Sequence, residues 1–111
     1  MIKVVVLAHK RADMSAEDFH RYWRDVHAPL LRRLPGLRRL VINRVLPDPT
    51  GGTPACDGIG EDWFDSLEAM RAALASPEGQ AVNADAPNFL DMSKLQFLVV
   101  EEEEVPLGTE G

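Results

Sequence analysis

The three histidines at positions 9, 20 and 27 are the side chains best suited to acid–base chemistry in this chain of 111 residues. An imidazole titrates near neutral pH, so it can take up and return a proton under ordinary conditions. His27 lies in the segment from Ser15 to Leu34, two residues before Pro29. We predict His27 as a catalytic acid or base that faces a ligand in a cleft between a helix and a sheet. The alternative is that His27 caps a kinked helix end by donating to free carbonyls.

Two further residues are candidates for the same chemistry. His9 follows the first apolar run and points either into the cavity of His27 or into solvent. Asp57 can orient a histidine or act as a base, although an Asp before Gly is also ordinary turn chemistry. His20 is flanked by Arg21, and we expect it at the surface.

The segment from Ser15 to Leu34 has the period of a helix. Ser15 is the expected N-cap, because its hydroxyl can accept from free N–H groups of the first turn, so the helix starts near Ala16. Pro29 disfavours helical geometry at the preceding residue and predicts a kink or break at His27–Ala28. An apolar stripe at positions i, i+4, i+7 and i+11 predicts the buried side, with His27 on its flank. Its members are Phe19, Trp23, Val26 and Leu30.

Aromatic side chains provide the expected wall of a ligand pocket. Tyr22 and Trp23 precede His27 on the helix, while Trp63 and Phe89 come from later segments. Large aromatic surfaces favour burial in a core or in a pocket, and the Tyr22 phenol can also donate to a ligand carbonyl. We predict these four residues as ligand-binding.

Composition narrows the class of function. The net charge of −6 argues against nucleic acid as a partner. No apolar run is long enough for a membrane span and no signal-peptide pattern is present, so we expect a cytoplasmic protein. Cys56 is the single cysteine, and no paired histidine motif occurs, so we expect no disulfide and no metal site. No glycine-rich phosphate loop is present, and we expect no cofactor.

The remaining pattern predicts four strands and further helices. Strands are expected at 2–8, 37–46, 56–64 and 96–101. Helices are expected at 66–74, where Ser66 is the cap, and from 76 towards 84, where Pro77 stands at the first helical position. A loop at 85–91 carries Phe89. The order strand, helix, strand, strand, helix, strand fits an α+β, ferredoxin-like βαββαβ fold, a four-stranded antiparallel sheet with its helices on one face.

The face of the sheet without helices needs a cover. The first, second and fourth strands are apolar on both faces, yet two helices cover only one face of a sheet. We expect a homodimer in which two sheets pack face to face, rather than a monomer covered by its acidic tail. One domain over residues 1–104 and a flexible tail at 105–111 complete the prediction.

The sequence contains four short motifs: Tyr22-Trp23 followed by His27-Ala28-Pro29-Leu30, the pair Asp57-Gly58, the run Trp63 to Asp65, and Asn88 to Asp91. Together they resemble the EthD family of dimeric α+β barrel proteins. Asp62 departs from the family pattern, which commonly has an apolar residue before the Trp-Phe pair. The resemblance implies the fold and the dimer. It implies less about chemistry, because the wider superfamily includes monooxygenases without cofactors, lactone isomerases, cyclases and dehydratases.

Two classes of function remain open. The first is a cofactor-free enzyme that acts by proton transfer on a small aromatic, polyketide-like or lactone substrate, with His27 as acid or base. The second is a non-catalytic accessory or ligand-binding dimer. An enclosed cavity lined by His27 and one other polar side chain favours the first class, whereas a cavity filled by side chains favours the second.

Overall fold

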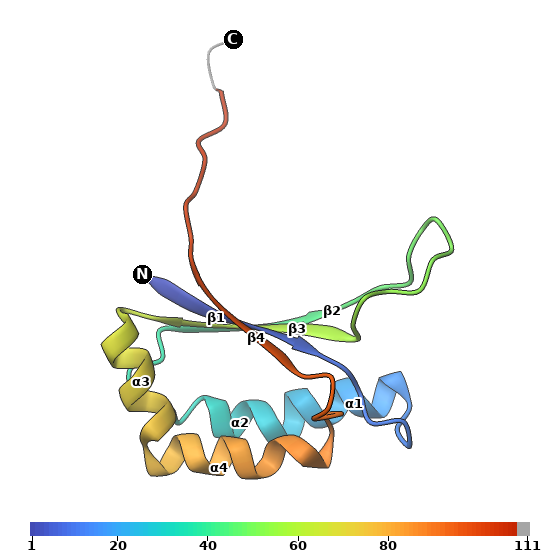
Figure 1. Ribbon diagram of the computed structural model, residues 1–111, viewed down its shortest axis with the longest axis horizontal. Coiled ribbons are helices and arrows are strands. Elements are labelled where there is room, and N and C mark those ends of the chain that lie inside the picture. Colours follow the sequence, from blue (N-terminus) through green and yellow to red (C-terminus); the bar gives the residue numbers. More distant parts are fainter. Residues whose placement is uncertain (109–111) are drawn as a thin grey trace.

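The computed structural model describes residues 1–108. It consists of one antiparallel sheet with a layer of helices on one face (Figure 1). This arrangement confirms the predicted α+β, ferredoxin-like fold. The strands are β1 (Ile2–Ala8), β2 (Arg39–Arg44), β3 (Gly58–Phe64) and β4 (Gln96–Glu101). The helical segments are α1 (Ala16–Tyr22), η1 (Trp23–His27), α2 (Ala28–Leu31), α3 (Leu67–Ala75), α4 (Pro77–Asp85) and η2 (Ala86–Asn88).

The strand order is β2-β3-β1-β4, with β1 and β3 in the centre. All three pairings are antiparallel, and Val4 of β1 lies between Asp62 of β3 and Val99 of β4. Side chains alternate between the two faces of a strand. The face that contains Val4 and Asp62 therefore turns to the helices, and the face that contains Val5 and Leu98 is left open.

The first helical segment differs from the prediction in a way that matters for the site. Of the expected kink or break at His27–Ala28, the break is wrong, because both residues keep right-handed helical backbone angles. Instead, η1 is a π-helical turn in which the Ala28 N–H donates to the Trp23 carbonyl, five residues back. Pro29 then stands in the first turn of α2, where its missing N–H costs little.

The wide turn also changes which residues are buried. A π-helical turn holds more residues than an α-helical turn, so the side chains after it are rotated relative to an ideal α-helix. Val26, predicted in the apolar stripe, is exposed, whereas His27 and Leu31 are buried. The buried stripe therefore runs through Phe19, Trp23, His27 and Leu31, and His27 lies in it rather than on its flank.

Serine caps fix the starts of three helices, and the sequence predicted those at Ser15 and Ser66. The hydroxyls of Ser15, Ser66 and Ser76 each accept from the backbone N–H three residues later. Ser76 both ends α3 and begins α4, so the chain turns sharply between these helices. The predicted loop at 85–91 contains the short 3₁₀ turn η2.

Two apolar clusters hold the helices on the sheet. One joins Val4 and Phe64 to Leu31, Leu34 and α3, and the other centres on aromatic rings. In the second cluster, Phe19, Trp23 and Phe89 lie with ring centroids 5.6 to 5.9 Å apart. At about 25 cal/mol per Å² of buried apolar surface, such rings are among the largest contributors to stability.

Glycines in β3 make room for the Trp23 indole. A Cβ atom at Gly58 would lie 2.6 Å from Trp23 Cζ3, and one at Gly60 would lie 3.0 Å from Trp23 Cζ2. The glycines that weaken this strand by propensity are therefore the residues that let the helix approach it.

Residues 102–108 have no regular secondary structure and are exposed. The predicted tail at 105–111 is described only to residue 108, and its flexibility stays a prediction, while residues 109–111 lie outside the described residues. None of the helices within residues 1–108 is both long and apolar enough to cross a membrane. The cytoplasmic location stays a prediction.

We expect Gly58→Ala to destabilise the protein by about 1–3 kcal/mol, because the added methyl group meets the rigid Trp23 ring. Urea unfolding followed by tryptophan fluorescence measures this loss. Gly52→Ala is the matched control, since its Cβ would meet only the carboxylate end of Asp48 in a loop. Equal stability of the two variants would contradict the close contact between Trp23 and β3.

Candidate functional site

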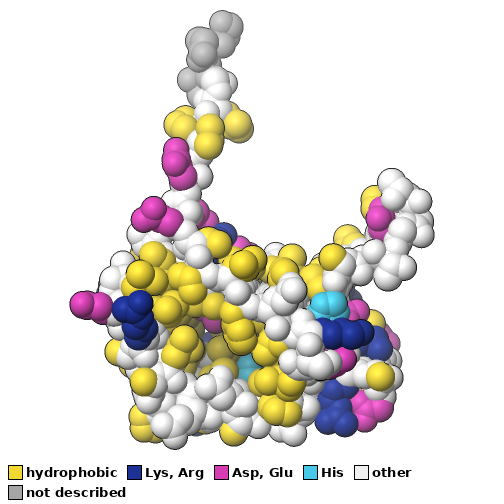
Figure 2. Space-filling model, in the orientation of Figure 1, with side chains coloured by type: hydrophobic (Ala, Val, Ile, Leu, Met, Phe, Trp, Pro, Cys, Tyr) yellow, Lys and Arg dark blue, Asp and Glu magenta, His cyan; other side chains and the backbone are white. Residues whose placement is uncertain are grey.

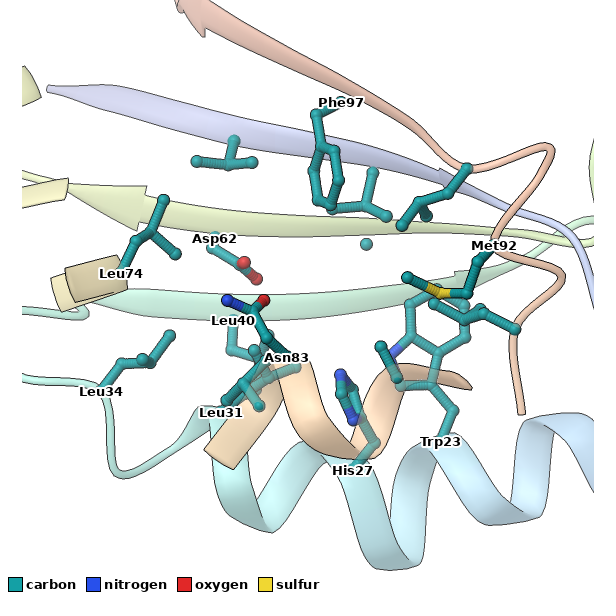
Figure 3. Close-up of a pocket in the computed structure, with 17 residues that line it drawn as sticks. Trp23, His27, Leu31, Leu34, Leu40, Asp62, Leu74, Asn83, Met92 and Phe97 are labelled. Carbon is teal, nitrogen blue, oxygen red and sulfur yellow. The ribbon is translucent and has the colours of Figure 1, made fainter. Parts of the chain in front are cut away.

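A cavity of about 230 Å³ lies between the helical layer and the sheet (Figure 3). Its walls are mostly aliphatic, with residues from β1, β2, β3, β4, η1, α2, α3, α4, η2 and the segment before β4. The polar side chains among its lining residues are His27, Asp62 and Asn83, together with the indole of Trp23. Figure 2 shows hydrophobic side chains gathered around a hollow between the two layers, with a histidine visible inside it. A mainly apolar cavity with few polar groups is typical of a small-molecule site.

His27 is held by one short hydrogen bond. Its Nδ1 atom lies 2.8 Å from Oδ2 of Asp85, the last residue of α4. An ionised carboxylate only accepts hydrogen bonds, so Nδ1 must carry the proton. In the neutral ring this leaves Nε2 with a free lone pair, and Figure 3 shows the ring directed from the helix into the cavity. His27 is therefore oriented as a proton acceptor.

Asp85 is itself fixed by two further donors. The Tyr22 hydroxyl donates to its Oδ1 at 2.6 Å, and the Asn88 amide donates to the same atom at 3.0 Å. Burial alone would raise the pKa of Asp85, but these bonds and the bond from His27 outweigh burial and lower it. Asp85 is thus ionised at neutral pH, as the orientation of His27 requires.

Burial keeps the His27 ring neutral. Its exposed fraction is only 6%, and the Phe89 ring packs against it with centroids 4.7 Å apart. Removal from water lowers the pKa of His27, and the hydrogen bond and charge of Asp85 only partly oppose this effect. A neutral imidazole at physiological pH is ready to accept a proton.

Asp62 is the other titratable side chain that lines the cavity. It is 9% exposed and stands on a central strand. Within the described residues no hydrogen bond to its carboxylate is found, and its oxygens stay accessible from the cavity, since no fully buried side-chain oxygen of these residues lacks a partner. Burial raises its pKa from 3.8 to about 6. A carboxyl group facing an apolar cavity without a partner is costly, and so it requires an explanation.

The structure brings only part of the predicted site together. His27 and Trp23 line the cavity, whereas Tyr22 and Phe89 lie behind His27 and hold the His27–Asp85 pair. The kinked-end capping alternative for His27 is wrong, because its side chain makes no cap hydrogen bond and binds Asp85 instead.

Three predicted site residues lie away from this cavity. His9 is at the end of β1, where its carbonyl accepts from the Asp91 N–H, and Asp57 accepts from the Lys10 N–H. Trp63 is on the open face of the sheet, between Lys3 and Arg39, and its Nε1 donates to Glu102.

His20 differs from its expected place at the surface. It is buried, 8% exposed, and stacked on Trp23 with an interplanar angle of 10°. The side chains of residues 1–108 offer no group of three or more His, Cys, Asp and Glu that could hold a metal ion.

Sequence reasoning missed Asp85 and Asn83 and treated Asp62 only as a departure from a family pattern. Asp85 stands at the boundary of a helix and a loop, where an acidic residue is unremarkable. Its role depends on a contact 58 residues away in the sequence. For Asp62 a signal was present, because a charged residue interrupts an otherwise buried strand pattern.

Comparison with known proteins gives a family and a set of similar folds. The sequence profile of the EthD domain matches residues 11–93. An uncharacterised 11.0 kDa protein from the thcB–thcC intergenic region of Rhodococcus erythropolis is 28% identical over 106 residues, which cover 96% of this chain and 100% of that protein.

Solved structures with a similar fold include an EthD family protein of Bacillus halodurans. It has a TM-score of 0.80 and 29% identity, covering 93% of this chain and 99% of that one. A dimeric ferredoxin-like protein of unknown function from Thermobifida fusca has a TM-score of 0.69 at 16% identity, covering 89% and 88% of the two chains. SnoaB, a cofactor-independent oxygenase of Streptomyces nogalater, has a TM-score of 0.63 at 15% identity, covering 94% of each chain.

We expect Asp62→Asn to stabilise the folded protein at pH 8 by on the order of 2 kcal/mol. The unfolded chain releases this proton near pH 3.8, whereas the folded protein holds it up to about pH 6. The stability contributed by Asp62 is therefore complete below pH 3.8 and is lost as the pH rises through about 6. Urea unfolding at pH 4 and pH 8 measures the difference, which should be small at pH 4.

Asp65→Asn is the matched control for this measurement. Asp65 is exposed and ion-paired with Arg38, and that pairing lowers its pKa, so its removal should not stabilise the protein at pH 8. If Asp62→Asn gives no gain in stability at pH 8, then Asp62 is not held as a buried, unpartnered carboxyl.

Proposed function

We propose that this chain, which belongs to the EthD domain family, is a cofactor-free enzyme that moves a proton on a small, largely apolar substrate. The observation that carries the proposal is the bond from His27 Nδ1 to Asp85, which leaves Nε2 as a free acceptor at an apolar cavity. General acid–base catalysis needs a base within reach of the substrate and with a pKa near the working pH. A buried, neutral histidine with a bare Nε2 at the cavity can accept a proton from a substrate bound there.

The roles of the neighbouring residues follow from their contacts. His27 is the proposed catalytic base. Asp85 is a positioning residue that fixes the ring tautomer and stabilises the imidazolium formed when the ring accepts a proton. Tyr22 positions Asp85, and Trp23 forms part of the wall against which a flat substrate can pack.

The size and lining of the cavity favour a particular class of substrate. About 230 Å³ is below the ~300–1,000 Å³ range of pockets for drug-sized ligands, so a molecule of one or two rings fits best. Small aromatic, polyketide-like and lactone substrates have this size. Isomerase, cyclase, dehydratase and substrate-activated monooxygenase reactions on such compounds can each begin with removal of an acidic proton by a general base.

The second candidate is a non-catalytic accessory or ligand-binding dimer. An accessory role would be consistent with a core filled by side chains. The open cavity lined by His27 and Asp62 supports the catalytic proposal instead.

We also propose a homodimer formed through the open face of the sheet. In the register of β1 with β4, Leu98 lies opposite Val5, on the face away from the helices. No helix of the described residues covers this face, and a stable interface there should bury well over about 1,000 Å². The dimeric fold relative from Thermobifida fusca supports the proposal.

For the catalytic proposal, the assay is deuterium exchange at the carbon next to the carbonyl of an enolisable aryl ketone, 2-acetonaphthone, followed by NMR. We expect His27→Asn to lower the enzyme-dependent rate by about 10²–10⁴, because the amide keeps the shape but cannot take up the proton. Asp85→Asn should also lower the rate, since its amide no longer selects the Nδ1–H tautomer. Asp91→Asn, which removes an exposed turn carboxylate, is the control. A His27→Asn protein that exchanges protons as fast as the unmodified protein would refute the proposal.

For the dimer, we expect the Leu98→Glu protein either to be a monomer in sedimentation at low micromolar concentration or to fail to fold. A charge buried without a partner between two sheets is strongly destabilising. Val26→Glu places the same charge on the exposed side of the helical layer and should leave the dimer intact. A monomeric unmodified protein at this concentration would rule out the interface.

A further inference from the structure

The geometry points to Asp62 as the group that binds a carbonyl oxygen of the substrate, by donating a hydrogen bond from its protonated carboxyl across the cavity from His27. This inference rests on the proposed function and adds to it the substrate class, an enolisable carbonyl compound. It assigns a ligand-binding role to a residue at which the chain departs from the family pattern.

The first argument is the position of Asp62. The residue is on β3, flanked in the sheet by Val4 and Leu40, and as a whole it is only 9% exposed. Figure 3 shows its carboxyl group directed towards the cavity and the helical layer. A carboxyl group contributes no packing advantage over an aliphatic side chain at such a site. Its presence is explained if a ligand atom completes its hydrogen bonding.

The second argument is the surroundings of Asp62. Of the side chains that line the cavity, only His27 is also titratable, and it comes from η1 on the opposite side. Asn83 of α4 points towards Asp62 in Figure 3, and the other lining side chains near Asp62 from β1, β2, β4 and α3 are apolar. The charged side chains of Lys3, Arg39 and Glu61 lie on the opposite face of the sheet. No cation of the described residues is placed to hold Asp62 ionised.

Burial supports the same assignment. It raises the pKa of Asp62 to about 6, so the acid form is accessible near neutral pH, and a ligand that expels water raises it further. A protonated carboxyl donates one O–H, and it suits a carbonyl or enol oxygen. An anionic ligand group would be repelled by the ionised form, so a neutral carbonyl compound fits best.

The two groups together define a balanced reaction step. Nε2 of His27 takes the proton from the carbon next to the carbonyl, and the C–H electron pair becomes the C=C bond of an enol. The carbonyl π electrons move to oxygen, which receives the proton of Asp62. His27 is then an imidazolium and Asp62 a carboxylate. Return of the enol proton to Asp62, and of the His27 proton to the same or another carbon, regenerates both groups without a co-reactant.

The test is the affinity of 2-acetonaphthone relative to 2-ethylnaphthalene, which has similar size but no carbonyl. Both dissociation constants are measured at pH 5 and pH 8 in a His27→Asn protein, so that Asp62 is the only titratable side chain left among those that line the cavity. We expect the preference for the ketone to be at least ~10-fold greater at pH 5 than at pH 8. When Asp62→Asn is added, the preference should not depend on pH, because the amide donates at both values.

Three results would overturn the assignment. One is a ketone preference that does not change with pH or changes equally without Asp62. Another is a greater preference at pH 8, which would make Asp62 a base. The third is no measurable binding of the ketone at either pH.

The exchange assay separates this assignment from the proposed function. If deuterium exchange depends on His27 while the preference for the ketone does not change with pH, only the proposed role of Asp62 fails. If the preference follows pH as expected while exchange does not depend on His27, the proposed function fails and Asp62 remains a carbonyl-binding residue.

Discussion

The π-helical turn from Trp23 to His27 is the constraint on which the rest of the site depends. Pro29 cannot donate a backbone hydrogen bond, and the chain meets this restriction by widening one turn rather than by ending the helix. The wider turn places Trp23, His27 and Leu31 on the buried side of the helix. Single π-helical turns within longer helices are often found at functional sites, and here the turn determines which side chain faces the cavity.

Two sets of contacts then fix the position and the protonation of His27. Trp23 packs against the glycines of β3 and fixes the distance between helix and sheet. Asp85, held by Tyr22 and Asn88, fixes the proton on Nδ1. Each of these contacts joins segments that are far apart in the sequence. The resulting cavity has a neutral base on its helical side and an unpartnered carboxyl on its sheet side.

Much of the fold was predictable because it depends on local signals. The serine caps, the apolar runs of β1 and β4 and the order of elements gave the ferredoxin-like arrangement, since each signal acts within a few residues. The phase of the first helix was not predictable from an ideal period of 3.6 residues. For this reason Val26, expected in the buried stripe, is exposed, and His27, expected on the flank of the stripe, lies within it. Asp85 was missed because only the tertiary fold brings it to His27. Trp63 was predicted as a pocket residue, but the alternation of β3 turns it to the open face.

The central claim is that His27 is a neutral, Nδ1-protonated base in the folded protein. Its most direct test is ¹⁵N NMR of the imidazole nitrogens across a pH titration. The account predicts a protonated Nδ1 and a bare Nε2 at neutral pH, with a pKa below the usual value of about 6.5, because burial outweighs the attraction of Asp85. A protonated Nε2 in the neutral ring, or a pKa above that value, would contradict it.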